Sequence, residues 1–336
     1  MFFKRTKQII GVELGSACLK AAVIELNEGT KELLVREYAI QSLEATTHDL
    51  VTSLGLLLSK LKTKCRDCAI AAWPDSAIFR FFEHDPTSTT PIRSVLNPDS
   101  SSSQGLDEYI LDFVDAGKGK QSPKGRLYAA CGVPRGELEA TRDLFKQLKY
   151  NIQLFQLTPI AVFNAYHSSL EVGPAPQPFL AIDFGRKRTS LSGGEAELHL
   201  MRAIEWGSDD LQRALVEQQL LTDSQTLQDL TLPSERLKEA LQEAILPLVR
   251  QIEFSLDYLR MEVDSGMVRD VHISGGLSNF GFFVEALQEA MAPTPCVKWN
   301  PFRKMQATNA ALKETGLLVD LFRLQPAAGA AIQFLK

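Results

Sequence analysis

The sequence has few cysteines and no long apolar segment. Its five cysteines are an odd number without the spacing of a disulfide framework, which indicates a reducing compartment. No stretch approaches the roughly eighteen consecutive apolar residues that a membrane-spanning helix needs. The basic opening residues lack the long apolar core of a signal peptide. Together these absences predict a cytoplasmic protein without direct membrane insertion.

A strong excess of one charge sign is also missing. Lys and Arg number 36 against 41 Asp and Glu, and the resulting net charge of −5 provides no general attraction for nucleic acid. We therefore expect no nucleic-acid partner.

Cys65 and Cys68 form a C-x-x-C pattern without two further ligands at suitable spacing. We interpret it as a turn between a helix and a strand, and metal or redox use stays open as the alternative.

Hydrophobic patterning predicts an α/β protein. Three strands joined by tight turns are expected at 8–14, 19–26 and 33–40, followed by a helix over 49–62 and a strand over 69–73. The second half begins in the same way, with strands at 179–185, 189–191 and 198–203. It continues with a long helix N-capped by Ser234, a strand at 270–274 and a helix over 281–291. Between the halves lie polar loops at 97–105 and 117–125, with a short helix or strand at 106–114 between them and a strand at 126–132 after them.

The chain repeats one element. Val12-Glu13-Leu14-Gly15 and Ile182-Asp183-Phe184-Gly185 share an apolar, acidic, apolar, glycine pattern at a strand end, 170 positions apart (183 − 13). A tight glycine turn lets backbone amides approach phosphate oxygens, and a carboxylate at the strand end can hold Mg²⁺ through water. Two such turns that face each other could hold a triphosphate from both sides. Gly275-Gly276 would allow close approach to a base or ribose.

Three stretches resemble motifs of the actin/Hsp70/sugar-kinase superfamily: residues 11–20 the phosphate-1 motif, 183–189 the phosphate-2 motif and 273–278 the adenosine motif. Within that superfamily, residues 206–211, 255–258, 300–302 and 326–331 resemble PilM-like type IV pilus assembly proteins, which are related to FtsA. The resemblance implies the duplicated two-lobe, actin-like ATPase (ribonuclease H-like) fold. It further implies a first lobe over 1–80 and 150–178, a small inserted subdomain over 81–149, and a second lobe over 179–336 with a helical subdomain at about 208–262.

The resemblance also implies a site for ATP or ADP with Mg²⁺. Asp183 and Glu13 would be the catalytic and, through water, the metal-binding carboxylates. The nucleotide-binding residues would be Gly15, Ser16, Lys20, Gly185, Arg186, Thr189, Gly207, Gly275, Gly276 and Ser278.

Three departures from the family pattern bear on activity. Glu13 replaces the usual Asp, Thr158 takes the place of a water-positioning acid, and Arg186-Lys187-Arg188 fill the phosphate-2 turn. Because loss of one positioning group typically costs orders of magnitude in rate, we expect weak or absent ATP hydrolysis.

The function implied by the resemblance is a scaffold of a type IV pilus, or related secretion, assembly platform. It would be cytoplasmic and peripheral to the inner membrane, and would bind the cytoplasmic tail of a PilN-like membrane protein. Other platform or motor components and a second copy of the chain are further possible partners. The alternatives are an active ATPase or small-molecule kinase of the same fold, and an FtsA-like cell-division protein.

Overall fold

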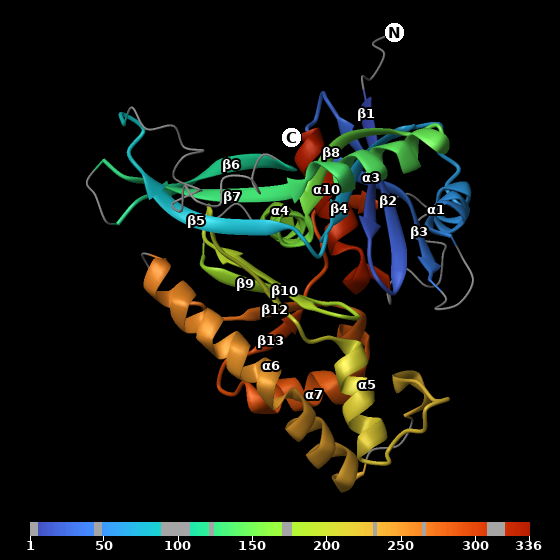
Figure 1. Ribbon diagram of the computed structural model, residues 1–336, viewed down its shortest axis with the longest axis vertical. Coiled ribbons are helices and arrows are strands. Elements are labelled where there is room, and N and C mark those ends of the chain that lie inside the picture. The colour runs from blue at the N-terminus through green and yellow to red at the C-terminus, as the bar shows by residue number, and fades with distance from the viewer. Residues whose placement is uncertain are drawn as a thin grey trace. The chain divides into compact units, whose positions relative to one another are not determined.

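The computed structural model describes residues 6–43, 49–88, 108–120, 124–169, 177–230, 234–263, 267–307 and 320–336. The polar segment 97–105 lies outside these ranges. The chain forms two compact units, residues 1–72 with 152–336 and residues 73–151, whose elements are labelled in Figure 1. None of the described helices has both the length and the apolar character required to cross a bilayer.

The larger unit contains a six-stranded sheet in the order β14-β3-β2-β1-β4-β8. Its strands are β1 (Thr6–Leu14), β2 (Cys18–Asn27), β3 (Leu33–Ser42), β4 (Asp67–Ala72), β8 (Asn151–Leu157) and β14 (Gln306–Ala307). β1, β2 and β3 are antiparallel neighbours, and β4 is parallel to β1. Consecutive residues of β2 are buried, and since neighbours along a strand point to opposite faces, both faces of this sheet are covered. The predicted strand–strand–strand–helix–strand order is confirmed.

Helices α1 (Leu50–Ser59), α4 (Thr158–Ser169) and α10 (Gln325–Leu335) accompany this sheet. α1 packs on β2 and β3, whereas α10 packs on β1, β2, β4 and α4. The small residues of α10 permit this approach, because a Cβ at Gly329 would lie 1.7 Å from the carbonyl oxygen of Ala161. The sequence-based division gave all of 179–336 to the second lobe. β14 instead pairs with β3 in the first sheet, and α10 packs on that sheet. The Ala-rich surface of α10 is buried there because small side chains allow close backbone contact with α4.

A five-stranded sheet in the order β11-β10-β9-β12-β13 repeats the plan. Its strands are β9 (Phe179–Phe184), β10 (Thr189–Gly194), β11 (Leu198–Ile204), β12 (Val271–Gly275) and β13 (Cys296–Lys298). β9, β10 and β11 are antiparallel neighbours, and β12 is parallel to β9, as β4 is to β1. α4 contacts β9, β10 and β11, so it lies against this sheet as well as against α10.

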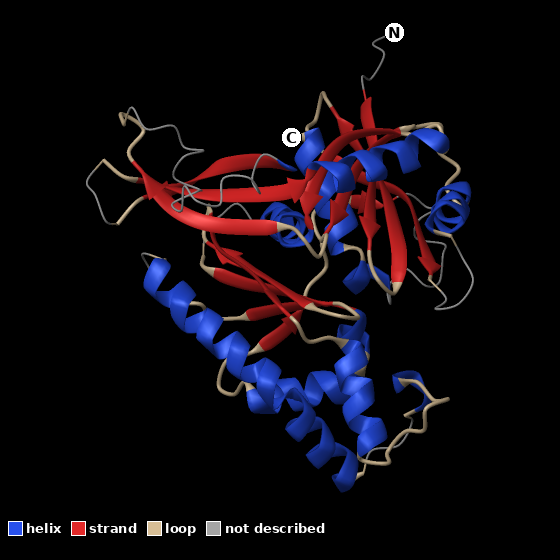
Figure 2. Cartoon of the chain, in the orientation of Figure 1, coloured by secondary structure: helices blue, strands red, loops and turns tan. Residues whose placement is uncertain are grey.

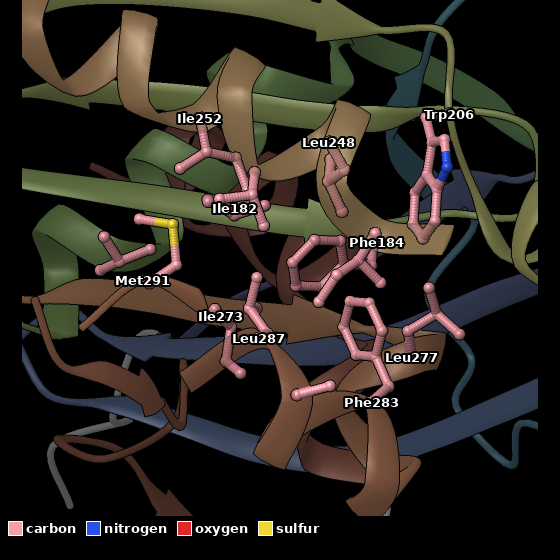
Figure 3. Close-up of a cluster of buried hydrophobic side chains, with 14 of the residues drawn as sticks. Ile182, Phe184, Trp206, Leu248, Ile252, Ile273, Leu277, Phe283, Leu287 and Met291 are labelled. Atoms are coloured by element: carbon pink, nitrogen blue, oxygen red, sulfur yellow. The ribbon is translucent and has the colours of Figure 1, made fainter. Parts of the chain in front are cut away.

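In its described residues, the second half contains, besides α10, the helices α5 (Ser208–Glu217), α6 (Glu235–Glu262) and α7 (Gly281–Ala290). It also contains the short 3₁₀ helices η3 (Leu227–Asp229), η4 (Gly276–Asn279) and η5 (Leu321–Arg323). As predicted, Ser234 caps α6 by accepting a hydrogen bond from the Leu237 amide at 3.1 Å. α6 packs on β11, α5 and α7, and Figure 3 shows the apolar core that results. Its labelled side chains come from both sheet and helices: Ile182, Phe184, Trp206, Leu248, Ile252, Ile273, Leu277, Phe283, Leu287 and Met291.

In its described residues, the smaller unit has a three-stranded antiparallel sheet in the order β5-β7-β6 and a helix, drawn in red and blue in Figure 2. Its elements are β5 (Ile78–His84), β6 (Tyr109–Lys118), β7 (Arg126–Pro134) and α3 (Arg135–Gln147). The segment 106–114, which the sequence left open between helix and strand, therefore contributes to strand β6 within its described part. The unit spans 73–151, close to the inserted subdomain predicted at 81–149.

Candidate functional site

The two predicted phosphate turns have the same construction. β1 and β2 are joined by residues 15–17, and a Cβ at Gly15 would lie 2.7 Å from the carbonyl oxygen of Cys18. β9 and β10 are joined by residues 185–188, and a Cβ at Gly185 would lie 2.7 Å from the carbonyl oxygen of Arg188. Both turns thus require glycine for the same steric reason, three residues before an equivalent carbonyl. This shared geometry establishes the internal duplication in structural terms.

Strand register makes Glu13 and Asp183 equivalent. Glu13 pairs with Lys20 across the first hairpin, and Asp183 pairs with Ser190 across the second. Both carboxyls are almost fully buried, with 6% and 5% of their surfaces exposed. Each carries charge that acts on Lys20, and the charge of Asp183 also acts on Glu13. Glu13 and Asp183 thus both act on Lys20, Glu13 through two direct hydrogen bonds and Asp183 through its charge.

Lys20 forms a buried ion pair with Glu13. Its Nζ donates to Oε1 at 2.8 Å and to Oε2 at 2.9 Å, and both side chains are 8% exposed. Burial by itself lowers the pKa of a lysine, but the charges of Glu13, Cys18 and Asp183 raise the pKa of Lys20 above its ordinary value. The ammonium therefore stays charged.

The two carboxyls hold protons more tightly than usual. Burial raises the pKa of Glu13 to about 7, against the opposing charge of Lys20 and with a further contribution from Asp183. Burial also raises the pKa of Asp183, while Lys20 and a hydrogen bond from the Ser274 hydroxyl at 3.0 Å oppose that rise. The charge of Lys20 thus lowers the pKa of both Glu13 and Asp183, against the effect of burial.

This arrangement does not fit a Mg²⁺ held by Glu13. Both oxygens of that carboxylate already accept from Lys20, and a metal would have to displace the ammonium or share its position at a cost in repulsion. Within the described ranges, no cluster of three or more His, Cys, Asp or Glu side chains has a metal-binding arrangement. Coordination through water by Asp183 alone stays a prediction.

The second turn is bound to the start of α5. The carbonyl oxygens of Gly185 and Arg186 accept hydrogen bonds from the Ser208 and Asp209 amides at 3.1 and 3.0 Å. The Arg186 Nε donates to the Asp209 carboxylate at 2.9 and 3.1 Å. A Cβ at Gly207 would lie 2.2 Å from the Arg186 carbonyl oxygen, so glycine is required there by close packing. These contacts use groups that the sequence assigned to phosphate binding.

Two other predicted contacts are hydroxyl groups with internal partners. Thr189 is fully buried and donates to the Trp206 carbonyl oxygen at 2.8 Å. Ser278 is also fully buried and donates to the Gly275 carbonyl oxygen at 2.7 Å. Each hydroxyl stabilises a turn. Their role in nucleotide binding stays a prediction.

The predicted adenosine motif contains one strained and one open glycine. Gly275 has φ of +90°, and a Cβ there would lie 2.3 Å from the Phe184 carbonyl oxygen. Because β12 pairs with β9 at this point, Gly275 is needed for strand packing alone. Gly276 is exposed, and a Cβ there would meet only one atom, at 3.9 Å. Ser16, in the turn between β1 and β2, is also exposed. Among the residues predicted to bind nucleotide, Ser16 in the first lobe and Gly276 in the second are therefore both accessible to a ligand.

Two residues near the carboxylates were missed from the sequence. Ser274 donates to Asp183 and to the Ile182 carbonyl oxygen at 2.9 Å. Arg323 of η5 contacts the Cys18 Sγ at 3.5 Å and Asp320 at 3.2 Å, and its charge lowers the pKa of Glu13. Ser274 falls inside the quoted adenosine motif and could have been singled out. Arg323 could not, since 305 positions separate it from Cys18.

The C-x-x-C pair lies at the start of β4. Cys65 precedes the strand, and its Sγ donates to the Gln8 carbonyl oxygen at 3.3 Å, while Cys68 is buried within the strand. Burial raises the pKa of both thiols, which disfavours the reactive thiolate.

Comparisons with known proteins identify the architecture. No protein-family model matches the chain, and no curated protein matches its sequence significantly. A solved chain of a PilM–PilN type IV pilus biogenesis complex is 15% identical, with 98% of each chain covered and a TM-score of 0.78. The diol dehydratase-reactivating factor in nucleotide-free form is 10% identical, with 98% of this chain and 100% of that chain covered and a TM-score of 0.56. The ethanolamine utilization protein EutJ from Carboxydothermus hydrogenoformans is 12% identical, with 97% and 90% covered and a TM-score of 0.50.

These likenesses in fold agree with the duplicated hairpins and the two sheets. The chain has the two-lobed actin-like fold predicted from its motifs, and its predicted resemblance to PilM is confirmed at the level of fold.

Proposed function

We propose that this chain is an actin-like scaffold subunit of a type IV pilus, or related secretion, assembly platform at the inner membrane. It binds the cytoplasmic tail of a PilN-like membrane protein and turns over ATP slowly or not at all. The observation that carries the proposal is the similarity to a chain of the PilM–PilN complex, which extends over 98% of both chains. The match includes the small unit as well as both sheets.

The proposed lack of turnover is supported by the chemistry of the candidate site. Hydrolysis needs a metal in near-octahedral geometry and a water aligned with the phosphate. Here Glu13 is paired with Lys20, Arg186 is paired with Asp209, and the residue before Pro159 is Thr158, which cannot ionise to position water. The groups that an active enzyme would use on its substrate are therefore used within the fold.

The small unit offers a surface for an extended apolar tail. A cavity of about 170 Å³ lies on its sheet, lined by residues of β5, β6 and β7 that include Ile78, Leu111 and Gly132. Within the described residues β6 is an edge strand, and its Phe113 and Val114 side chains are 39% and 56% exposed. An extended peptide could pair with this edge and place apolar side chains on the sheet. We assign the tail to this surface.

Cross-linking in intact cells tests the partner. The tagged full-length chain would be cross-linked, purified from membranes and analysed by mass spectrometry. We expect an inner-membrane protein with a short cytoplasmic tail, cross-linked through that tail to the small unit. Phe113→Glu should abolish the cross-link, whereas the matched variant Phe254→Glu, at an exposed position of α6, should retain it. Recovery of no such protein, or equal loss in both variants, would reject the proposed partner surface.

Calorimetric titration with ATP and Mg²⁺ tests the nucleotide component separately. We expect binding that is weak or undetectable, and phosphate release no faster than in buffer. Steady-state hydrolysis that Asp183→Ala abolishes would instead show an active ATPase or a kinase of the same fold. That result would leave the partner experiment unaffected.

A further inference from the structure

The N-terminal half of α6 and the helix α7 enclose a groove that the proposed function does not use. Its volume is about 260 Å³, and it is lined by residues of both helices, which pack against each other. Figure 1 shows the course of the two helices. Leu237 and Leu241 of α6 and Phe282 of α7 form its apolar floor. Leu237 and Leu241 belong to the core of the second lobe, so the floor is fixed by packing that is independent of any ligand.

The rim of this groove is acidic. Glu235 of α6 and Glu285 and Glu289 of α7 line it together with one cation, Lys238, which gives a formal charge of −2 (three carboxylates and one ammonium). Lys238 donates to Glu289 at 2.8 Å, and this hydrogen bond and the charges of all three glutamates raise its pKa. The chain's own ammonium thus shows that the rim accommodates a cationic side chain above an apolar floor.

We propose that the groove between α6 and α7 binds a basic segment of a partner protein, one in which Lys or Arg side chains alternate with apolar residues. Charge complementarity decides the occupant: the carboxylates attract Lys and Arg, whose aliphatic stems can cover the leucine floor while the charged heads reach the rim. The same carboxylates repel phosphates, which excludes nucleic acid and anionic lipid headgroups as occupants. Since the groove lies on α6 and α7 and the proposed tail surface lies on β5, β6 and β7, the inference concerns a second partner site.

Fluorescence anisotropy with a defined probe tests this inference on the full-length chain. The probe is a short labelled peptide of alternating lysine and leucine, and its matched partner has glutamate in place of lysine. We expect saturable binding of the basic peptide alone. Glu285→Lys should weaken it about tenfold, because an attractive charge becomes a repulsive one. Glu239→Lys makes the same charge change on the exposed surface of α6 outside the groove, and should alter binding less than twofold.

A variant with the opposite effect distinguishes peptide binding in the groove from general charge attraction. Lys238→Met removes the internal competitor while keeping the apolar stem, so the basic peptide should bind several-fold more tightly. Arg236→Met removes the same charge from the exposed surface of α6 and should leave binding unchanged. The inference is overturned if the glutamate peptide binds equally well or if Glu239→Lys weakens binding as much as Glu285→Lys. Peptide binding that Glu285→Gln and Lys238→Met leave unchanged would also overturn it, and thermal melting would confirm that each variant is folded.

Discussion

Replacement of Lys20 by methionine distinguishes a structural lysine from a ligand-binding one. The side chain is buried, and its ammonium makes two charged hydrogen bonds to Glu13 at 2.8 and 2.9 Å. Methionine fills a similar volume but leaves the buried Glu13 carboxylate without its cation. Removal of one partner from a buried ion pair costs about 3–5 kcal/mol, a large fraction of the roughly 5–15 kcal/mol that stabilises a typical protein. We therefore expect Lys20→Met to lower the free energy of unfolding by about 3–5 kcal/mol near pH 8.

The loss should depend on pH in a defined direction. Without the ammonium, the pKa of Glu13 rises above its present value of about 7, because burial raises it and Lys20 no longer opposes that effect. The folded variant can relieve the unpaired charge by binding a proton, which becomes easier as the pH falls. Destabilisation should thus be smaller near pH 6 than near pH 8.

Urea denaturation followed by circular dichroism at both pH values measures these changes. The double variant Glu13→Gln/Lys20→Met should recover most of the lost stability, because replacement of both partners of a buried pair is often neutral. Arg260→Met is the matched control, since it removes the cation of an exposed ion pair with Asp257 and should cost less than about 1 kcal/mol. A Lys20→Met variant that is as stable as the original chain but loses ATP binding would show that Lys20 is a ligand-binding residue and not a structural one.

Three further changes have calculable outcomes. The pKa of Glu13 rises from an ordinary 4.5 to about 7 on folding, so between these values the folded chain binds more protons than the unfolded one. The free energy of unfolding should therefore decrease as the pH rises from about 5 to about 8. Urea denaturation at several pH values should show a weaker dependence of that free energy on pH for Glu13→Gln. Gly275→Ala should cost about 3 kcal/mol or more in thermal melts, because φ is +90° and the new Cβ would meet the Phe184 carbonyl oxygen, whereas Gly276→Ala should cost less than about 1 kcal/mol. Phe283→Ala should cost about 3–5 kcal/mol, because its ring is fully buried against Phe184, and equal stability of this variant and the original chain would contradict the packing described.

Much of the fold follows from local patterns in the sequence. Strands with buried faces, a glycine at each hairpin turn and the N-cap Ser234 were predicted because each depends on residues close together in the chain. The repeat of Glu13 and Asp183 in equivalent positions predicted two lobes of one plan, since similar local sequences adopt similar hairpins. The place of α10 could not be predicted in this way. Its Ala-rich sequence fits many surfaces, and close backbone contact with α4 selects one of them.

The sequence by itself determined which residues could belong to a nucleotide site and which motifs carry the actin-like fold. Only the tertiary structure decided how those residues are used. Lys20 faces Glu13 across a strand pair, Arg186 reaches Asp209 at the start of α5, and Gly275 packs on Phe184. The physical reason is that a motif specifies the type and spacing of its side chains, whereas the partners available to a buried charge or carbonyl depend on distant segments that folding brings into contact.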